Sequence, residues 1–70
     1  MNRTPVSSSN LRSVGYDSAT NTLEIAFHGG RVYQYFNVPE SVYQGLLNAA
    51  SHGKHHHRHI KETYPYERIR

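Results

Sequence analysis

Residues 22–36 read TLEIAFHGGRVYQYF and carry the clearest structural signal in this chain of 70 residues. Apolar and polar side chains alternate through the first six positions, so Leu23, Ile25 and Phe27 share one face of a predicted strand. The central glycine pair accepts the positive φ angles of a hairpin turn, and the aromatic-rich positions after it are typical of a partner strand. The stretch therefore predicts an antiparallel hairpin with one apolar face.

The length of the hairpin turn determines which way Tyr33 and Tyr35 point. A two-residue turn pairs Ile25 with Gln34 and leaves both tyrosines in water, on the face opposite Ile25. A three-residue turn pairs Ile25 with Tyr33 and Leu23 with Tyr35, which packs both tyrosines against the apolar face. Because the first register would bury the amide of Gln34, we favour the second, in which the tyrosines are structural. The alternative role for two tyrosines on one strand face is to stack on the bases of a nucleic acid.

The flanking residues extend the hairpin into a small domain. Asp17–Asn21 has the side chains of a turn, which separates the hairpin from a preceding strand. Pro39 suits the first turn of a helix, and apolar residues recur at helical spacing after it. Residues 54–62 are predicted to form a short second helix that ends before Pro65. We predict strands near residues 10–16, 22–27 and 31–36, a helix near residues 39–50, and a core of Leu23, Ile25, Phe27, Val42 and Leu46.

This pattern indicates an α+β fold: a three-stranded antiparallel β-meander with one or two helices packed on one face. A chain of this length makes one domain, so we predict a single domain over residues 1–70 with a loose N-terminal segment at residues 1–7. There is no cysteine to form a disulfide or to act as a nucleophile. No apolar run is long enough to span a membrane, and residues 1–10 lack the apolar stretch of a signal peptide. We therefore expect a cytoplasmic protein without membrane contact.

The net charge of +3 is concentrated in residues 51–70. Basic and acidic side chains cancel in residues 1–50, whereas residues 51–70 hold five basic against two acidic side chains and five of the six histidines. Such an asymmetry points to an anionic partner, with RNA as the first candidate. Lys54, Arg58 and Lys61 follow one another at spacings of four and three residues, so on a helix they would share one face that could contact phosphates. A helix face that is simply exposed to solvent explains the same pattern equally well. The predicted nucleic-acid contacts are Lys54, His55, Arg58, Lys61 and Arg31.

The histidines also raise the question of a metal site. His52 and His56, or His55 and His59, lie four residues apart, a spacing that can hold Zn²⁺ or Ni²⁺ on a helix. A closed site requires four ligands, and the segment has no cysteine and few carboxylates, so we predict no metal and no cofactor. Protonation of histidines between about pH 7.5 and about pH 5.5 would instead add positive charge beside the basic side chains. No spacing of nucleophile and base stands out, so we predict no catalytic residues and no enzymatic activity.

Several stretches together resemble the KTSC domain family, a module at the C-terminus of some lysyl-tRNA synthetases that also occurs in single-domain proteins of bacteria and phages. The centre of the resemblance is Tyr33 and Tyr35, which match the Tyr-x-Tyr signature of the family. The chain departs from the family at residues 55–57, where relatives tend to have aromatic or other residues. The resemblance covers residues 6–68 and depends on the order of Ser8-Ser9-Asn10-Leu11, Val14-Gly15-Tyr16-Asp17, Leu23-Glu24-Ile25-Ala26-Phe27, Gly30-Arg31-Val32-Tyr33-Gln34-Tyr35-Phe36, Val38-Pro39-Glu40, Ser51-His52-Gly53-Lys54 and Tyr64-Pro65-Tyr66-Glu67-Arg68.

RNA binding has been suggested for this family, and the resemblance implies the same for this chain. Our leading hypothesis from the sequence is a non-enzymatic module that binds RNA through the basic, histidine-rich C-terminal segment. The alternative is a protein-interaction or small-anion-binding module of bacterial or phage origin, with a host or translation-related protein as its partner. Affinity for RNA that falls steeply with salt would favour the first hypothesis.

Overall fold

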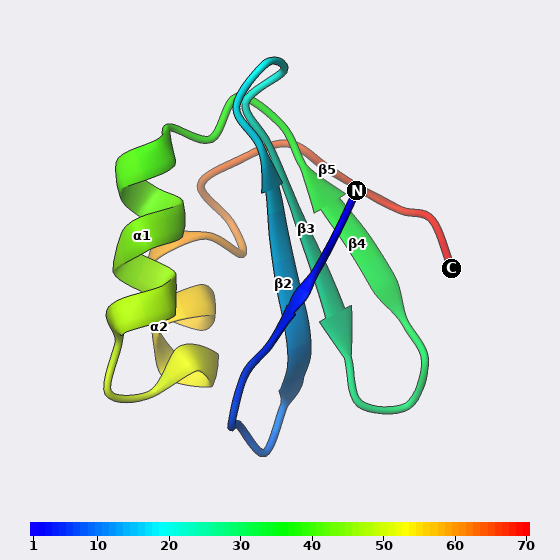
Figure 1. Ribbon diagram of the computed structural model, residues 1–70, viewed down its shortest axis with the longest axis vertical. Coiled ribbons are helices and arrows are strands. Elements are labelled where there is room, and N and C mark those ends of the chain that lie inside the picture. The colour runs from blue at the N-terminus through cyan, green and yellow to red at the C-terminus, as the bar shows by residue number, and fades with distance from the viewer.

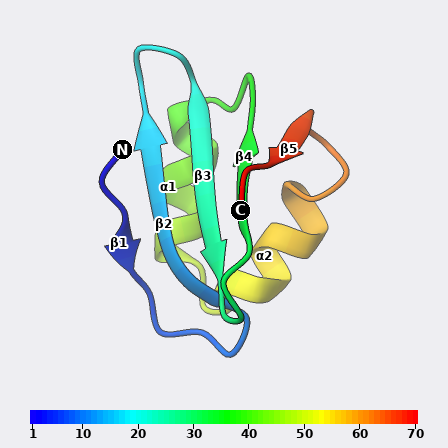
Figure 2. The same ribbon diagram turned by 90° about the vertical axis from the view of Figure 1, so that its right-hand side faces the viewer.

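A five-stranded antiparallel sheet with two helices on one face makes up the computed structural model, which describes residues 1–70 (Figure 1). The order of the strands across the sheet is the same as their order along the chain. Figure 2 shows α1 behind β2 and β3, and α2 toward β4 and β5. The elements are β1 (Thr4–Pro5), β2 (Leu11–Asp17), β3 (Thr22–Phe27), β4 (Val32–Tyr35), α1 (Glu40–Asn48), α2 (His52–His59) and β5 (Tyr66–Arg68).

The hairpin of β3 and β4 has the register that we favoured from the sequence. Leu23 pairs with Tyr35 and Ile25 pairs with Tyr33, so both tyrosines lie on the apolar face. Gly29 and Gly30 have φ angles of 99° and 94°, which L-residues rarely adopt, and they allow the chain to reverse. The side-chain amide of Gln34 is kept out of the core and donates to the Glu24 carboxylate at 2.9 Å.

The α+β class and the meander of β2, β3 and β4 are confirmed, but the sheet has two more strands than the three predicted. The first is β1, which lies within the segment expected to be loose and pairs with β2. A 2.9 Å ion pair between Arg3 Nη1 and Glu24 Oε2 fixes this segment. A Cβ atom at Gly15 would lie 2.5 Å from the backbone oxygen of Asn2, so only glycine admits the segment there. The second is β5, which follows Pro65 and pairs with the free edge of β4.

The core lies between the sheet and the helices. Leu46 is the buried residue of α1, whereas Val42, which we expected in the core, is only partly buried. α2 begins at His52, two residues before the predicted start, because the Ser51 hydroxyl accepts from the Lys54 amide at its N-terminus. No helix is both long and apolar enough to cross a membrane. The core cluster consists of Leu11, Val14, Leu23, Ile25, Phe27, Tyr35, Val38, Leu46 and Ile60.

Candidate functional site

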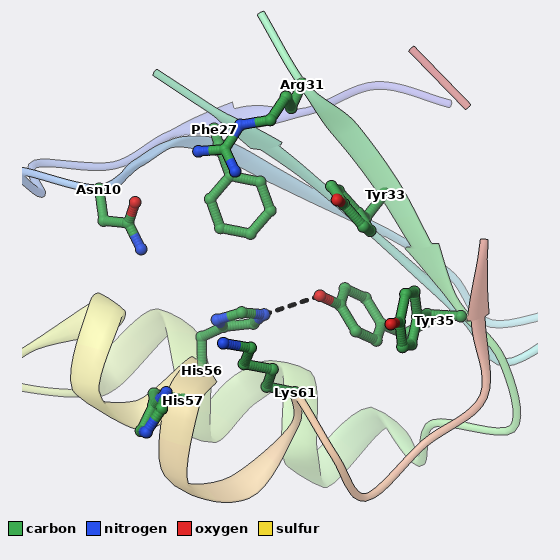
Figure 3. Close-up of a pocket in the computed structure, with 9 residues that line it drawn as sticks. Asn10, Phe27, Arg31, Tyr33, Tyr35, His56, His57 and Lys61 are labelled. Atoms are coloured by element: carbon green, nitrogen blue, oxygen red, sulfur yellow. Dashed lines mark hydrogen bonds between the residues drawn. The ribbon is translucent and has the colours of Figure 1, made fainter. Parts of the chain in front are cut away.

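A cavity of about 200 Å³ opens between the sheet and α2, on the side of β4 and β5. Its floor is aromatic and its rim is polar and basic (Figure 3). We call it the aromatic pocket. Its lining residues are Asn10, Phe27, Arg31, Tyr33, Tyr35, His56, His57, Lys61 and Tyr66.

Three tyrosines from two strands form one side of the aromatic pocket. The pairing of β4 with β5 sets Tyr35 opposite Tyr66, and alternation along β4 brings Tyr33 to the same face. The ring centroids of Tyr33 and Tyr66 are 5.7 Å apart, as are those of Tyr35 and Tyr66. Tyr35 is 3% exposed, whereas Tyr66 is 57% exposed, so the outer ring is accessible to a ligand while the inner ring belongs to the core.

Phe27 and Arg31 continue the sheet side of the pocket at the hairpin end of β3 and β4, where the Phe27 ring meets the Tyr33 ring edge-on with 5.7 Å between centroids. The guanidinium carbon of Arg31 lies 5.5 Å from the centroid of the Phe27 ring, which is the geometry of a cation–π contact. The Phe27 ring also meets the His56 ring edge-on, with 5.2 Å between centroids. Figure 3 shows Arg31 above the Phe27 ring and Lys61 beside His56, on the side of the pocket formed by the helix.

A buried hydrogen bond between Tyr35 and His56 closes the bottom of the pocket. The Tyr35 hydroxyl and His56 Nε2 are 2.8 Å apart. Burial, followed by the charges of Lys61 and His57, lowers the pKa of His56 from 6.5 to about 4. Burial, with smaller contributions from the neighbouring Tyr33 and Tyr66, raises the pKa of Tyr35 to about 12. Near neutral pH both groups are therefore uncharged, and the charge around the pocket is that of its cationic rim.

The pocket therefore combines two kinds of binding surface. Exposed tyrosine rings such as that of Tyr66 can stack on a planar ring. Arg31 and Lys61 supply hydrogen-bond donors and positive charge for an anion. Arg31 and Lys61 are exposed and form no ion pair with a carboxylate, since the single ion pair of the chain joins Arg3 to Glu24. A ligand that carries both a flat aromatic ring and a phosphate would engage both surfaces.

A second, shallower depression of about 490 Å³ adjoins the aromatic pocket. Asn10 and His57 line both, so the two hollows share a boundary. Lys54 and Arg58 project from α2 into the second one. We call it the basic groove; its lining residues are Ser9, Asn10, Ser51, Gly53, Lys54, His57 and Arg58.

The structure distributes the five predicted nucleic-acid contacts over three places. Arg31 and Lys61 line the aromatic pocket, although 30 residues separate them in the sequence. Lys54 and Arg58 line the adjoining basic groove. His55 does not line the pocket or the groove, but lines a further hollow with Lys54 and Arg58. It also lies near Gly45 of α1, whose added Cβ would be 3.4 Å from His55 Cε1. Burial, followed by the charges of His59 and His52, lowers the pKa of His55.

No group of three or more His, Cys, Asp or Glu side chains is arranged to hold a metal ion. The rings of His55 and His59 are close, with 4.7 Å between centroids, but they form only a pair. His52 Nδ1 is hydrogen-bonded to the Leu46 carbonyl at 2.8 Å, and His56 Nε2 is bonded to Tyr35. The two spacings of four residues in the sequence therefore do not converge on one centre.

Four pocket residues, Asn10, His56, His57 and Tyr66, were not predicted as ligand contacts from the sequence, although His56 was considered as a metal ligand. His56 lies four residues before the buried Ile60, so the helical period carried a signal that position 56 faces the core. Tyr66 lies in a strand of only three residues, and so short a strand shows no alternation of apolar and polar side chains by which it could be predicted. Asn10 carries no signal of its own beyond its place in the Ser8–Leu11 stretch.

Comparisons with known proteins agree on one family. The model of the KTSC domain matches residues 7–64. An uncharacterized protein of Stutzerimonas stutzeri is 44% identical over 70 residues, which cover 99% of each chain. The lysine–tRNA ligase of Nostoc punctiforme is 41% identical over 59 residues, which are 84% of this chain and 10% of that protein. The crystal structure of a KTSC domain protein from Yersinia pestis has a TM-score of 0.93 and 40% identity, and the match covers 99% of this chain and 97% of that one.

Proposed function

The chain belongs to the KTSC domain family, and from this premise and the geometry of its pocket we propose that it is a non-catalytic module that binds single-stranded RNA. The observation that carries the proposal is the aromatic pocket, in which the exposed ring of Tyr66 and the partly buried ring of Tyr33 lie inside a rim of cations without carboxylate partners. Single-stranded RNA is recognised by stacking splayed bases on aromatic side chains while basic residues hold the phosphates. In this proposal one base enters the aromatic pocket.

The phosphates of the same strand would follow a continuous basic path. Lys54 and Arg58 line the basic groove, and His57 lies where the groove meets the pocket. Arg31 and Lys61 then stand on opposite sides of the pocket mouth (Figure 3). A strand that passes through the groove into the pocket would therefore keep its backbone near cations along its whole course.

The charge state of the pocket supports binding rather than acid–base chemistry. A catalytic base works best when its pKa lies near the working pH, whereas the pKa of His56 is lowered to about 4. The Tyr35 phenol, with its pKa raised to about 12, stays protonated and hydrogen-bonded to that imidazole. These two groups form a rigid neutral floor and leave recognition to the rim.

The relatives give separate support. The protein of Nostoc punctiforme that contains a similar segment is named a lysine–tRNA ligase, so its name states that it acts on an RNA. The similar segment makes up 10% of that protein and would act there as an accessory to the ligase domain. By analogy we propose that this chain binds RNA or an RNA-containing assembly of the translation system.

Fluorescence anisotropy with a short labelled single-stranded RNA tests the proposal. Affinity should fall with salt, with a slope of about 0.7 in log K against log [salt] for each phosphate that is neutralised. The double variant Lys54→Gln/Arg58→Gln should bind more weakly and lose about 1.4 from that slope. Arg12→Gln is the matched control, because Arg12 lies with Ala26 and Val32 on the opposite face of the sheet.

The histidine at the rim gives a second measurement. Protonation of a histidine beside phosphates strengthens binding, so affinity should rise as pH falls from about 7.5 to about 5.5. His57→Gln tests the histidine where the groove meets the pocket, and His55→Gln tests the histidine that shares a neighbouring hollow with Lys54 and Arg58. Absence of RNA binding at low salt would refute the proposal and favour the alternative of a protein partner or a small anion. A double-stranded RNA of the same length should bind less tightly, because its bases cannot enter the pocket.

A further inference from the structure

We propose that Asn10 reads the identity of the base in the aromatic pocket and gives the protein a preference for adenine. This inference rests on the proposed function and adds a specificity to it. Asn10 stands at the boundary of the aromatic pocket and the basic groove, where a base would leave the phosphate path. Figure 3 shows its amide at the mouth of the pocket, across from His56 and His57.

The backbone at Asn10 is held from two sides. Its N–H donates to the Ser8 hydroxyl at 3.2 Å, and the next amide, that of Leu11, donates to the same oxygen. Its carbonyl accepts from the His28 amide at 3.1 Å, and the His28 ring is bonded to the Ser8 carbonyl at 2.9 Å. An added Cβ at Gly53 would lie 3.6 Å from the Cβ of Asn10, so α2 passes directly beneath it. The Ser8–Asn10 turn is therefore fixed relative to both the sheet and α2.

The side-chain amide of Asn10 is the free neutral donor and acceptor pair at the pocket mouth. The side chain is exposed and forms no hydrogen bond within the chain, although its backbone is bonded twice. Arg31 and Lys61 can only donate, and they attract any phosphate regardless of its base. Tyr35 and His56 already satisfy one another. The Tyr33 and Tyr66 hydroxyls and the His57 ring also line the pocket, but the amide of Asn10 presents a neutral donor and acceptor side by side. We therefore assign discrimination between uncharged base edges to Asn10.

Adenine is the base that an asparagine amide pairs with most commonly. The amide oxygen accepts from the adenine N6 amino group while the amide nitrogen donates to N7, and a bidentate pair of this kind discriminates against the other bases. Guanine is usually read by the two-pronged edge of an arginine. Here the Arg31 guanidinium lies over the Phe27 ring, and in the proposed complex its N–H groups bond to a phosphate rather than to a base edge. The pocket thus presents an adenine-reading group and no arginine that is free to take its place.

The test compares four RNAs that are identical uridine tracts except for one central adenine, cytosine, guanine or uracil. The wild-type protein should bind the adenine-containing RNA at least about fivefold more tightly than the uridine tract, which corresponds to the lower end of a bidentate pair. Asn10→Ala should reduce this ratio to less than about twofold, whatever its effect on the affinity for the uridine tract itself. Asn10→Asp, which keeps the size but loses the donor, should also lose the ratio. Lys54→Gln should weaken all four RNAs equally, because a phosphate contact carries no sequence information.

The outcomes separate this inference from the proposed function. RNA binding with salt dependence but without an adenine preference, or with the preference intact in Asn10→Ala, would overturn the role of Asn10 alone. Absence of binding to all four RNAs would overturn both. A thermal melt of each variant establishes that it is folded, and Asn10→Asp serves if Asn10→Ala does not fold.

Discussion

Lowering the pH from about 7.5 to about 5.0 should destabilise the protein through one buried imidazole, that of His56. His56 is 5% exposed and is surrounded by Phe27 and Tyr35 from the sheet and by His57 and Lys61 from its own segment. None of these neighbours is an acid that is charged at neutral pH, so nothing nearby favours the protonated ring. Its pKa in the folded chain is about 4 instead of 6.5.

The sign and the size follow from this difference. Between pH 4 and 6.5 the unfolded chain binds a proton at this position that the folded chain does not, so stability falls as the pH falls. Integration of the difference in bound protons gives a loss of about 2 kcal/mol at pH 5.0 relative to pH 7.5. A small domain has a free energy of unfolding of roughly 5 kcal/mol, so this loss is a large fraction of the total. Stability above about pH 7.5 should not depend on this group.

Urea unfolding followed by circular dichroism, at several pH values in this range, measures the effect. His56→Gln should flatten most of the pH dependence, because glutamine can bond to the Tyr35 hydroxyl but does not titrate. His57→Gln is the control, since His57 is exposed and the slope should persist. His55→Gln should remove a smaller part of the pH dependence of stability, with the same sign, because burial also lowers the pKa of His55. A parent whose unfolding midpoint is unchanged from pH 7.5 to pH 5.0, or a His56→Gln variant that keeps the full slope, would refute the reasoning.

Three further outcomes are expected. Leu46→Ala should destabilise the domain by about 2–5 kcal/mol, and Leu47→Ala, at a partly buried position, by less; equal urea midpoints for the two would contradict the assigned core. Gly15→Ala should displace the N-terminal segment, because the new Cβ would meet the backbone oxygen of Asn2. Trypsin should then cleave after Arg3 faster in this variant than in a Ser13→Ala control. An unchanged cleavage rate would disprove the close contact. A metal chelator should leave the circular dichroism spectrum and the melting temperature unchanged, and unfolding by the chelator would reveal a structural metal.

The sequence predicted the hairpin of β3 and β4 well because local rules determine it. Alternation marks the strand, paired glycines mark the turn, and the cost of burying Gln34 selects the register. The two edge strands were missed because Thr4–Pro5 and Tyr66–Arg68 are too short to show a period. The ion pair between Arg3 and Glu24 holds β1, and the free edge of β4 holds β5. Neither contact can be recognised from the order of residues in the sequence.

The candidate site was predicted in part. Arg31 and Lys61 were singled out by charge, and they line one pocket in the structure. His55 was grouped with them because helical spacing places it beside the basic stripe; it shares a hollow with Lys54 and Arg58, although not the aromatic pocket, and its ring also lies near Gly45 of α1. The packing of α2 on the sheet determines which of its faces meets the pocket, and that packing depends on contacts between distant residues such as Tyr35 and His56.

The order of the strands across the sheet has a consequence for how the molecule assembles. Short turns or loops join neighbouring strands from β1 to β4, so these pairs close over short loops and can form early. The pair of β4 with β5 instead spans both helices and must wait until they are in place. β5 has only three residues and all of them are exposed, so its pairing belongs to the least stable part of the sheet. Because Tyr66 belongs to β5, we expect the aromatic pocket to be completed only after both helices are in place, whereas the hairpin of β3 and β4 can form without it.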